Sequence, residues 1–91
     1  MYNVKVGHSR PCWRKGDLEQ EEVVIDNKSF KTRKDAKVFI ERALVGKPNV
    51  CGEYHKGDKP SRRRYYTGKT WTHENTGERC EESYTYVLEK A

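Results

Sequence analysis

The first third of the chain combines a clear strand pattern with a polar stretch. Apolar or aromatic side chains alternate with polar ones at the start, as in a β-strand with one buried face. The alternating positions on that face are Tyr2, Val4, Val6 and His8. The stretch Ser9–Glu22 holds turn-forming residues and few apolar ones, which predicts a loop. The β-branched run Val23–Ile25 predicts a short second strand that ends at the turn formers Asp26 and Asn27.

The segment Arg33–Val45 carries the pattern of an amphipathic helix. Thr32 is suited to cap its first turn, and Asp35 follows three residues later, as in a variant of the capping box. Gly46 is expected to end the helix, and Pro48 prevents it from resuming. Apolar residues recur at helical spacing and form one stripe that we expect to pack on a sheet, namely Ala36, Phe39, Ile40, Ala43 and Leu44.

The second half of the chain predicts a loop followed by a long hairpin. Lys47–Ser61 contains glycines and prolines and is expected to be a loop. Arg62–His73 and Glu78–Glu89 are rich in Tyr, Thr, Trp and Val, and the glycine-containing segment between them predicts a hairpin connection. One hairpin face would collect Tyr65, Trp71, Tyr84, Tyr86 and Leu88, and the other Thr70, Thr72, Ser83, Thr85 and Val87.

The predicted order is therefore β-β-α-β-β. It describes a single α+β domain spanning residues 1–91, in which one helix packs on an antiparallel sheet that ends in a long hairpin. Hydrophobic residues make up only 33% of the chain and charged residues 36%, so the core is expected to be thin. A thin core favours support from a partner, a metal or self-association as a homo-oligomer.

Composition also bears on where the protein acts. No apolar run approaches the roughly 18 residues that a membrane span needs. The first residues form a mixed strand pattern and not the apolar segment of a signal peptide. The three cysteines Cys12, Cys51 and Cys80 are an odd number, which does not suit a closed disulfide framework. We therefore expect separate thiols and a cytoplasmic location.

The net charge of +5 is unevenly distributed along the chain. Residues 28–47 hold seven Lys or Arg against two acidic residues, and residues 55–71 hold six against one, whereas residues 17–26 hold five acidic residues and no cation. Cations that bind phosphates, interleaved with rings that stack on bases, are typical of nucleic-acid-binding surfaces. The candidate nucleic-acid-binding residues are Arg62, Arg63, Arg64, Tyr65, Tyr66 and Lys69 on the strand, with Arg33, Lys34 and Lys37 on the helix.

Other interpretations of the same residues stay open. The glutamates of the last strand would neutralise part of the basic strand if they lie opposite it, and they are Glu78, Glu81, Glu82 and Glu89. The aromatic residues would equally serve as the core of so small a domain. The same basic surface would also suit an acidic protein partner, as in a phage-type inhibitor or adaptor that blocks a host enzyme or defence complex.

The sequence also offers a weak metal motif and little sign of catalysis. His8 and Cys12, with Cys51 and His55, would supply the two imidazoles and two thiolates of a structural zinc site. Isolated thiols and surface histidines are the alternative. Thr67–Thr70 lacks the first glycine of a phosphate-binding loop and no helix follows it, and nothing fixes the histidines for acid–base chemistry. We therefore expect a protein that is not an enzyme.

Part of the chain resembles the domain of the plant "defective chloroplasts and leaves" protein and its bacterial and phage relatives. The resemblance rests on Val24–Ala36, which includes Phe30-Lys31-Thr32-Arg33-Lys34, and on Thr76-Gly77-Glu78 and Glu82-Ser83-Tyr84 near the end. The family's second helical stretch and its His-Pro segment are absent, and Lys47–Ser61 stands in their place. The resemblance implies a role in RNA maturation or beside RNA polymerase, without a defined active site. Our leading hypothesis is a small basic accessory protein that binds RNA or single-stranded nucleic acid.

Overall fold

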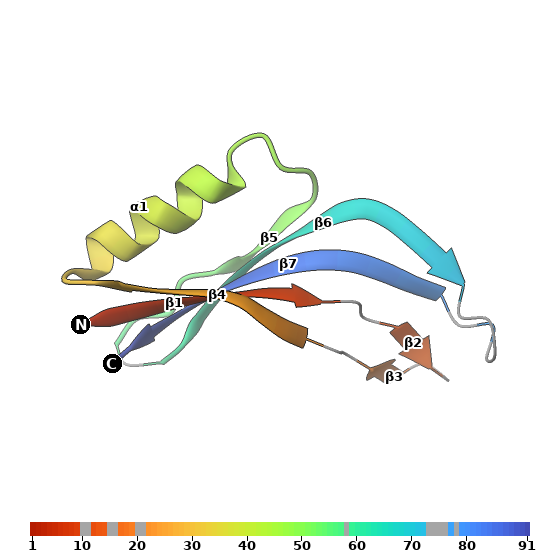
Figure 1. Cartoon of the computed structure of the whole chain (residues 1–91), viewed down its shortest axis with the longest axis horizontal. Coiled ribbons are helices and arrows are strands. Elements are labelled where there is room, and N and C mark those ends of the chain that lie inside the picture. The colour runs from red at the N-terminus through yellow and green to blue at the C-terminus, as the bar shows by residue number, and fades with distance from the viewer. Residues whose placement is uncertain (10–11, 15–16, 20–21, 58, 73–76, 78) are drawn as a thin grey trace.

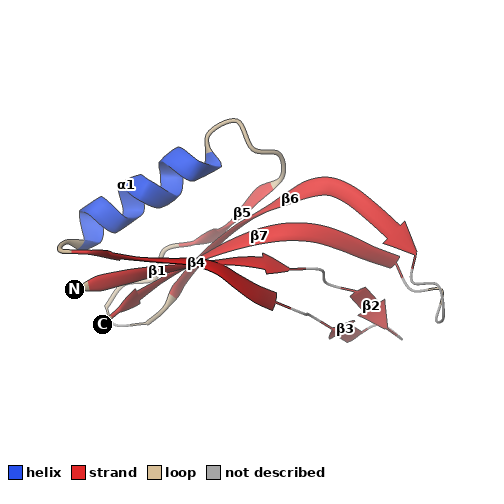
Figure 2. Ribbon diagram, viewed as in Figure 1, coloured by secondary structure: helices blue, strands red, loops and turns tan. Residues whose placement is uncertain are grey.

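A computed structural model describes residues 1–9, 12–14, 17–19, 22–57, 59–72, 77 and 79–91, and the statements below refer to these residues. One helix and a set of strands make up the fold, and strands cover most of the chain (Figures 1 and 2). The elements in chain order are β1 (Tyr2–Ser9), β2 (Cys12–Arg14), β3 (Asp17–Glu19), β4 (Glu22–Phe30), α1 (Arg33–Leu44), β5 (Val50–Glu53), β6 (Ser61–Thr72) and β7 (Arg79–Lys90).

All strands belong to one antiparallel sheet whose centre is β7. On one side β7 pairs with β1 and, further along, with β2; on the other side it pairs with β6. Strand β4 lies beside β1, β3 beside β2, and β5 beside β6. At the end of the sheet covered by α1, the order across it is therefore β4-β1-β7-β6-β5, five strands wide. The two chain ends meet there, since Tyr2 pairs with Lys90 (Figure 1).

The apolar stripe of α1 packs on one face of this sheet, as the sequence predicts. Ala36, Ile40 and Leu44 are buried, whereas Phe39 and Ala43 are partly buried at the border of the same cluster. The helix begins at its predicted cap, because the Thr32 hydroxyl accepts a hydrogen bond of 3.1 Å from the Asp35 amide. The strands contribute the other half of this core, which consists of Val4, Val6, Tyr65, Tyr86 and Leu88.

The predicted fold class is confirmed, but two predicted loops contain strands. Ser9–Glu22 includes β2 and β3, and Lys47–Ser61 includes β5. The predicted turn at Asp26 and Asn27 is also wrong, because both residues lie inside β4 and pair with β1. These segments are short or polar, so pairing with a neighbouring strand outweighs their weak intrinsic preference. The predicted hairpin connection lies largely outside the described residues.

Substitution of Ile40 tests the assigned core. Ile40 is fully buried between α1 and the sheet, so Ile40→Ala is expected to lower the free energy of unfolding by about 2–5 kcal/mol. Val38 on the same helix is 39% exposed, and Val38→Ala is expected to change the free energy of unfolding by less than about 0.5 kcal/mol. Urea unfolding followed by circular dichroism measures both. Equal losses in the two variants would contradict the packing of this helix face.

Candidate nucleic-acid interface

The three consecutive arginines of β6 do not form one surface, because neighbouring strand residues point to opposite faces. Arg63 lies on the face that α1 covers, where its Nε is 3.2 Å from the Glu41 carboxylate of the helix. Arg64 lies on the other face, where its Nε donates to the Thr85 hydroxyl at 2.9 Å. Arg62 shares that second face by alternation and is exposed. Tyr65, on the α1 side, is buried in the core and stacks on Tyr84.

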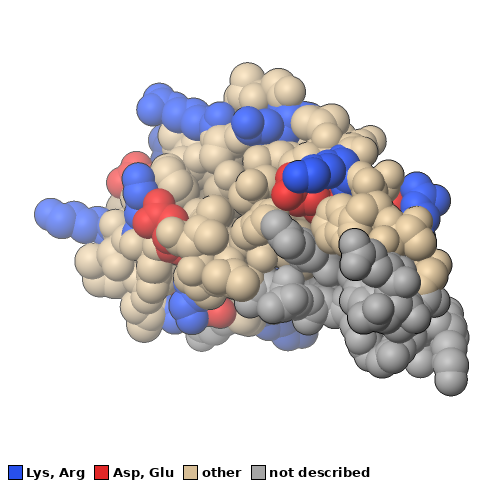
Figure 3. Space-filling model, turned by 45° about the vertical axis from the view of Figure 1, so that its right-hand side comes forward, with Lys and Arg blue, Asp and Glu red and all other residues tan. Residues whose placement is uncertain are grey.

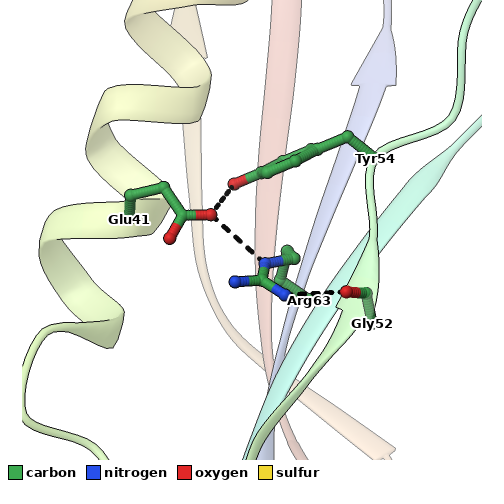
Figure 4. Close-up of polar contacts among 4 residues, drawn as sticks. All are labelled: Glu41, Gly52, Tyr54 and Arg63. Atoms are coloured by element: carbon green, nitrogen blue, oxygen red, sulfur yellow. Dashed lines mark hydrogen bonds and ion pairs between the residues drawn. The ribbon is translucent and has the colours of Figure 1, made fainter.

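Arg63 joins three elements on the α1 side of the sheet (Figure 4). Besides its bond to Glu41, it donates to the Gly52 carbonyl of β5 at 2.7 Å, and its guanidinium lies 5.7 Å from the centre of the Tyr54 ring. The Tyr54 hydroxyl donates to the same Glu41 oxygen at 2.7 Å. Arg63 therefore anchors β5 and α1 to β6, and its charge is matched inside the protein.

Close approach of β5 to β6 depends on Gly52. Its backbone φ is +93°, a conformation that favours glycine. A Cβ atom at this position would lie 2.2 Å from the Arg62 carbonyl oxygen. The glycine thus brings its own carbonyl within reach of Arg63 and places the nearby Tyr54 beside the helix.

The contacts of Glu41 fix its charge state and that of its partner. The hydrogen bond from Tyr54 lowers the pKa of Glu41, and the Arg63 guanidinium lowers it further against the opposing effect of burial. Burial, together with the adjacent carboxylate, raises the pKa of the Tyr54 hydroxyl. At neutral pH the cluster therefore contains an ionised Glu41, a neutral Tyr54 and a cationic Arg63.

Three of the predicted cations gather at the start of α1. Arg33, Lys34 and Lys37 line a shallow, open hollow of about 410 Å³ on one face of α1, together with Val38 and Glu41 of the same helix. The Arg33 guanidinium also donates to the backbone carbonyl of His55, and the Lys37 ammonium lies 4.6 Å from the centre of the Tyr54 ring. Figure 3 shows Lys and Arg side chains along the top of the molecule, the side on which α1 lies in Figure 1.

The lining of this hollow has excess positive charge. Glu41 contributes the acidic group of the lining, and that group already accepts from Tyr54 and pairs with Arg63. Asp35 in the first turn of α1 is the other carboxylate of this region, so the three cations Arg33, Lys34 and Lys37 outnumber the acidic groups beside them. Val38, which is 39% exposed, adds an apolar patch to the same hollow. This arrangement suits a ligand with several negative charges and some apolar surface.

The remaining predicted strand residues lie on the face of the sheet away from α1 or near the hairpin end. Arg64 donates to the Tyr66 hydroxyl at 3.4 Å, and its guanidinium lies 6.0 Å from the centre of that ring. Tyr66 is partly exposed. Lys69 is exposed in the stretch where the β6–β7 register shifts. The structure thus divides the candidate residues between two opposite faces and the core.

The described glutamates of β7 have partners other than the arginines of β6. Glu81 pairs with Arg79 at 3.2 Å and Glu89 with Lys5 at 3.5 Å, whereas Glu82 lies 2.9 Å from the His8 ring. The contact with His8 lowers the pKa of Glu82, and the charge of Lys69 has a smaller effect in the same direction. Glu78 lies outside the described residues. Among the described residues, these three glutamates therefore pair with other groups and not with Arg62 or Arg64.

The structure does not bring together His8 and Cys51, two of the four proposed zinc ligands. His8 lies on β1, whereas Cys51 lies on β5 at the edge of the sheet with two strands between them, which corresponds to about 14 Å between strand axes. Backbone pairing sets Cys12 opposite Cys80, and the Cys12 side chain is not described. Within the described part of the chain, no group of three or more His, Cys, Asp or Glu residues is arranged to hold a metal ion.

The expectation of three separate thiols needs a correction. Cys80 is fully buried and disulfide-bonded, whereas Cys51 is an exposed free thiol. An odd number of cysteines is compatible with one disulfide and one free thiol, and the sequence count alone did not separate this case from three free thiols. The cytoplasmic location inferred from that count stays a prediction.

Sequence reasoning identified the three cations of the hollow but missed Glu41, together with Gly52 and Tyr54, which act on it. The spacing of Arg33, Lys37 and Glu41 at four-residue intervals shows that they share one helix face, and this signal was available. Gly52 and Tyr54 gave no comparable signal, because they reach this face only through the pairing of β5 with β6.

Comparisons of the chain with protein-family models, with curated proteins and with solved structures found no match. The resemblance to the "defective chloroplasts and leaves" domain therefore stays a prediction. Among the described residues, α1 is the one helix, and it is too short and too polar to cross a membrane.

The Tyr54–Glu41 hydrogen bond predicts a dependence of stability on pH. The pKa of Glu41 lies below its ordinary 4.5 in the folded protein, so the unfolded chain binds more protons in acid and stability falls as the pH drops through that lowered pKa. Tyr54→Phe removes the largest cause of this shift. We expect the variant to lose less stability between about pH 7 and pH 3, as measured by urea unfolding.

Tyr66→Phe is the matched control for this measurement. It removes a hydroxyl that contacts Arg64 on the opposite face of the sheet, away from Glu41. Its pH profile is expected to parallel that of the parent protein. A Tyr54→Phe profile that also parallels the parent would show that the hydrogen bond does not set the charge of Glu41.

Proposed function

We propose that the protein binds the phosphate backbone of RNA or of single-stranded nucleic acid, without catalysis, through the basic hollow at the start of α1. The observation that carries the proposal is the placement of Arg33, Lys34 and Lys37 around one hollow whose own carboxylate, Glu41, is matched by Arg63 and Tyr54. Each cation that contacts a phosphate releases condensed counterions, which favours binding at low salt.

The chemistry of the hollow favours contact with the backbone over the reading of base edges. Its polar groups are mainly the ends of long cationic side chains, which position a phosphate chain but carry little sequence information. The apolar Val38 offers a surface for a sugar or an unstacked base. The preference for RNA or single strands draws on the resemblance described above, which implies roles in RNA maturation or beside RNA polymerase.

Two alternatives give different results in the same experiment. The opposite face of the sheet carries Arg62, Arg64 and Tyr66, which would combine phosphate contacts with stacking on a base. A protein-binding inhibitor or adaptor would use the basic surface for an acidic protein instead, and it would show no salt-dependent affinity for nucleic acid.

Paired charge removals locate the binding surface. Lys34→Gln with Lys37→Gln removes two candidate contacts from the hollow, so affinity for a single-stranded RNA should fall and the slope of log affinity against log salt should decrease by about 1.4. Arg62→Gln with Lys69→Gln removes the same charge from β6 and is expected to leave the slope nearly unchanged. Fluorescence anisotropy over a salt series measures both.

Four results would contradict the proposal or a part of it. A larger loss in the β6 pair would place binding on the opposite face of the sheet. Equal, small losses in both pairs would indicate that only net charge matters. Absence of salt-dependent binding to RNA and to single-stranded DNA by the parent protein would favour the protein-partner alternative, and tighter binding to duplex DNA would contradict the single-strand preference.

A further inference from the structure

The loop between β5 and β6 lies directly beside the basic hollow. This β5–β6 loop comprises residues 54–60, and Figure 2 draws it in tan at the end of the sheet where the two chain ends meet. The Arg33 guanidinium of α1 donates to the His55 carbonyl of the loop. The Lys37 ammonium lies 4.6 Å from the centre of the Tyr54 ring, at the start of the loop. Arg33 and Lys37 both line the hollow, so the two surfaces adjoin.

The β5–β6 loop carries two cations of its own. Lys56 and Lys59 are exposed, and no described residue forms an ion pair or a hydrogen bond with either side chain. Other lysines are engaged: Lys5 pairs with Glu89. Asp58 lies between the two loop lysines in the sequence and outside the described residues. Even with Asp58 counted, the loop adds positive charge to the region beside the hollow.

The β5–β6 loop is held on both sides. The His55 amide donates to the Ser61 hydroxyl at 2.8 Å, and Ser61 is buried where β6 pairs with Leu88 of β7. The Arg33 guanidinium holds the same residue from the helix side through the His55 carbonyl. Lys56 directly follows this doubly bonded residue. Cations on a segment that is already positioned lose less conformational entropy when they bind a ligand.

We propose that the RNA-binding surface continues from the hollow onto the β5–β6 loop, so that one single-stranded backbone contacts Lys34 and Lys37 on α1 and Lys56 and Lys59 on the loop. The inference rests on the proposed function and extends its site to a second element. Cations on two adjoining elements match a ligand whose phosphates repeat along a chain, because each cation can contact a different phosphate. Arg33 acts here as a positioning residue that joins the loop to the helix.

Removal of the loop charges tests the extension. For Lys56→Gln with Lys59→Gln, affinity for a single-stranded RNA should fall and the slope of log affinity against log salt should decrease by about 1.4, since two contacts are lost. Arg62→Gln with Lys69→Gln removes the same charge from β6 and should leave the slope nearly unchanged. Fluorescence anisotropy over a salt series measures both variants beside the parent protein.

Lysine footprinting reads the same contacts without any substitution. Reductive methylation of the parent protein, with and without the single-stranded RNA, is followed residue by residue by mass spectrometry. Bound RNA should protect Lys56 and Lys59 together with Lys34 and Lys37. Lys69, which is exposed on β6, should keep its reactivity.

The outcomes separate this inference from the function on which it rests. If the pair Lys34→Gln with Lys37→Gln weakens binding while the loop pair binds as the parent does, the extension is wrong and the proposed function stands. A loop-pair loss no larger than that of the β6 pair, or loop lysines that stay fully reactive when RNA is bound, would also overturn the extension. A parent protein without salt-dependent binding to RNA would overturn the function and the extension together.

Discussion

The packing of the α1 stripe against the sheet determines which side chains of β1, β6 and β7 point into the core. Ala36, Ile40 and Leu44 need an apolar surface, and the sheet supplies one from β1, β6 and β7. Tyr65 is buried in that core, so its side chain points toward α1. Because side chains alternate along β6, Arg63 also points toward the helix, and Arg62 and Arg64 point away from it. The orientation of a basic strand is thus set by its apolar neighbours.

That orientation changes what the basic residues can do. The sequence suggests that Arg63 binds a ligand. In the structure its guanidinium instead donates to the Gly52 carbonyl of β5 and to the Glu41 carboxylate of α1, which fixes both elements to β6. By matching the charge of Glu41, it leaves the cations at the start of the helix with an excess of positive charge. The ion pair of Arg63 with Glu41 therefore leaves the hollow that Glu41 lines with net positive charge.

The two edges of the sheet differ in how they are protected. Strand β5 is short, and Gly52 allows it to lie very close to β6. Strand β4 is long and carries a bulge, but its apolar residues remain uncovered. Natural sheets usually protect an edge by shortness, charge, a bulge or a covering segment, and β4 has a bulge at its apolar centre and charge on either side of it. The two edges therefore differ in how their backbones are protected and in the apolar surface that they leave uncovered.

Local patterns in the sequence were sufficient for the elements whose signal is local. Residue spacing and propensity predict the apolar stripe of the helix, its Thr32 cap and the two long strands of the final hairpin. These elements in turn predict the α+β class and the core positions on α1. The remaining features depend on segments that meet only in the folded chain. Asp26 and Asn27 join a strand because β1 lies beside them, and Tyr54 meets Glu41 because β5 pairs with β6. Contacts between residues far apart in the chain have no period of their own, so only the pairing of the strands decided which of the alternating arginines faces α1.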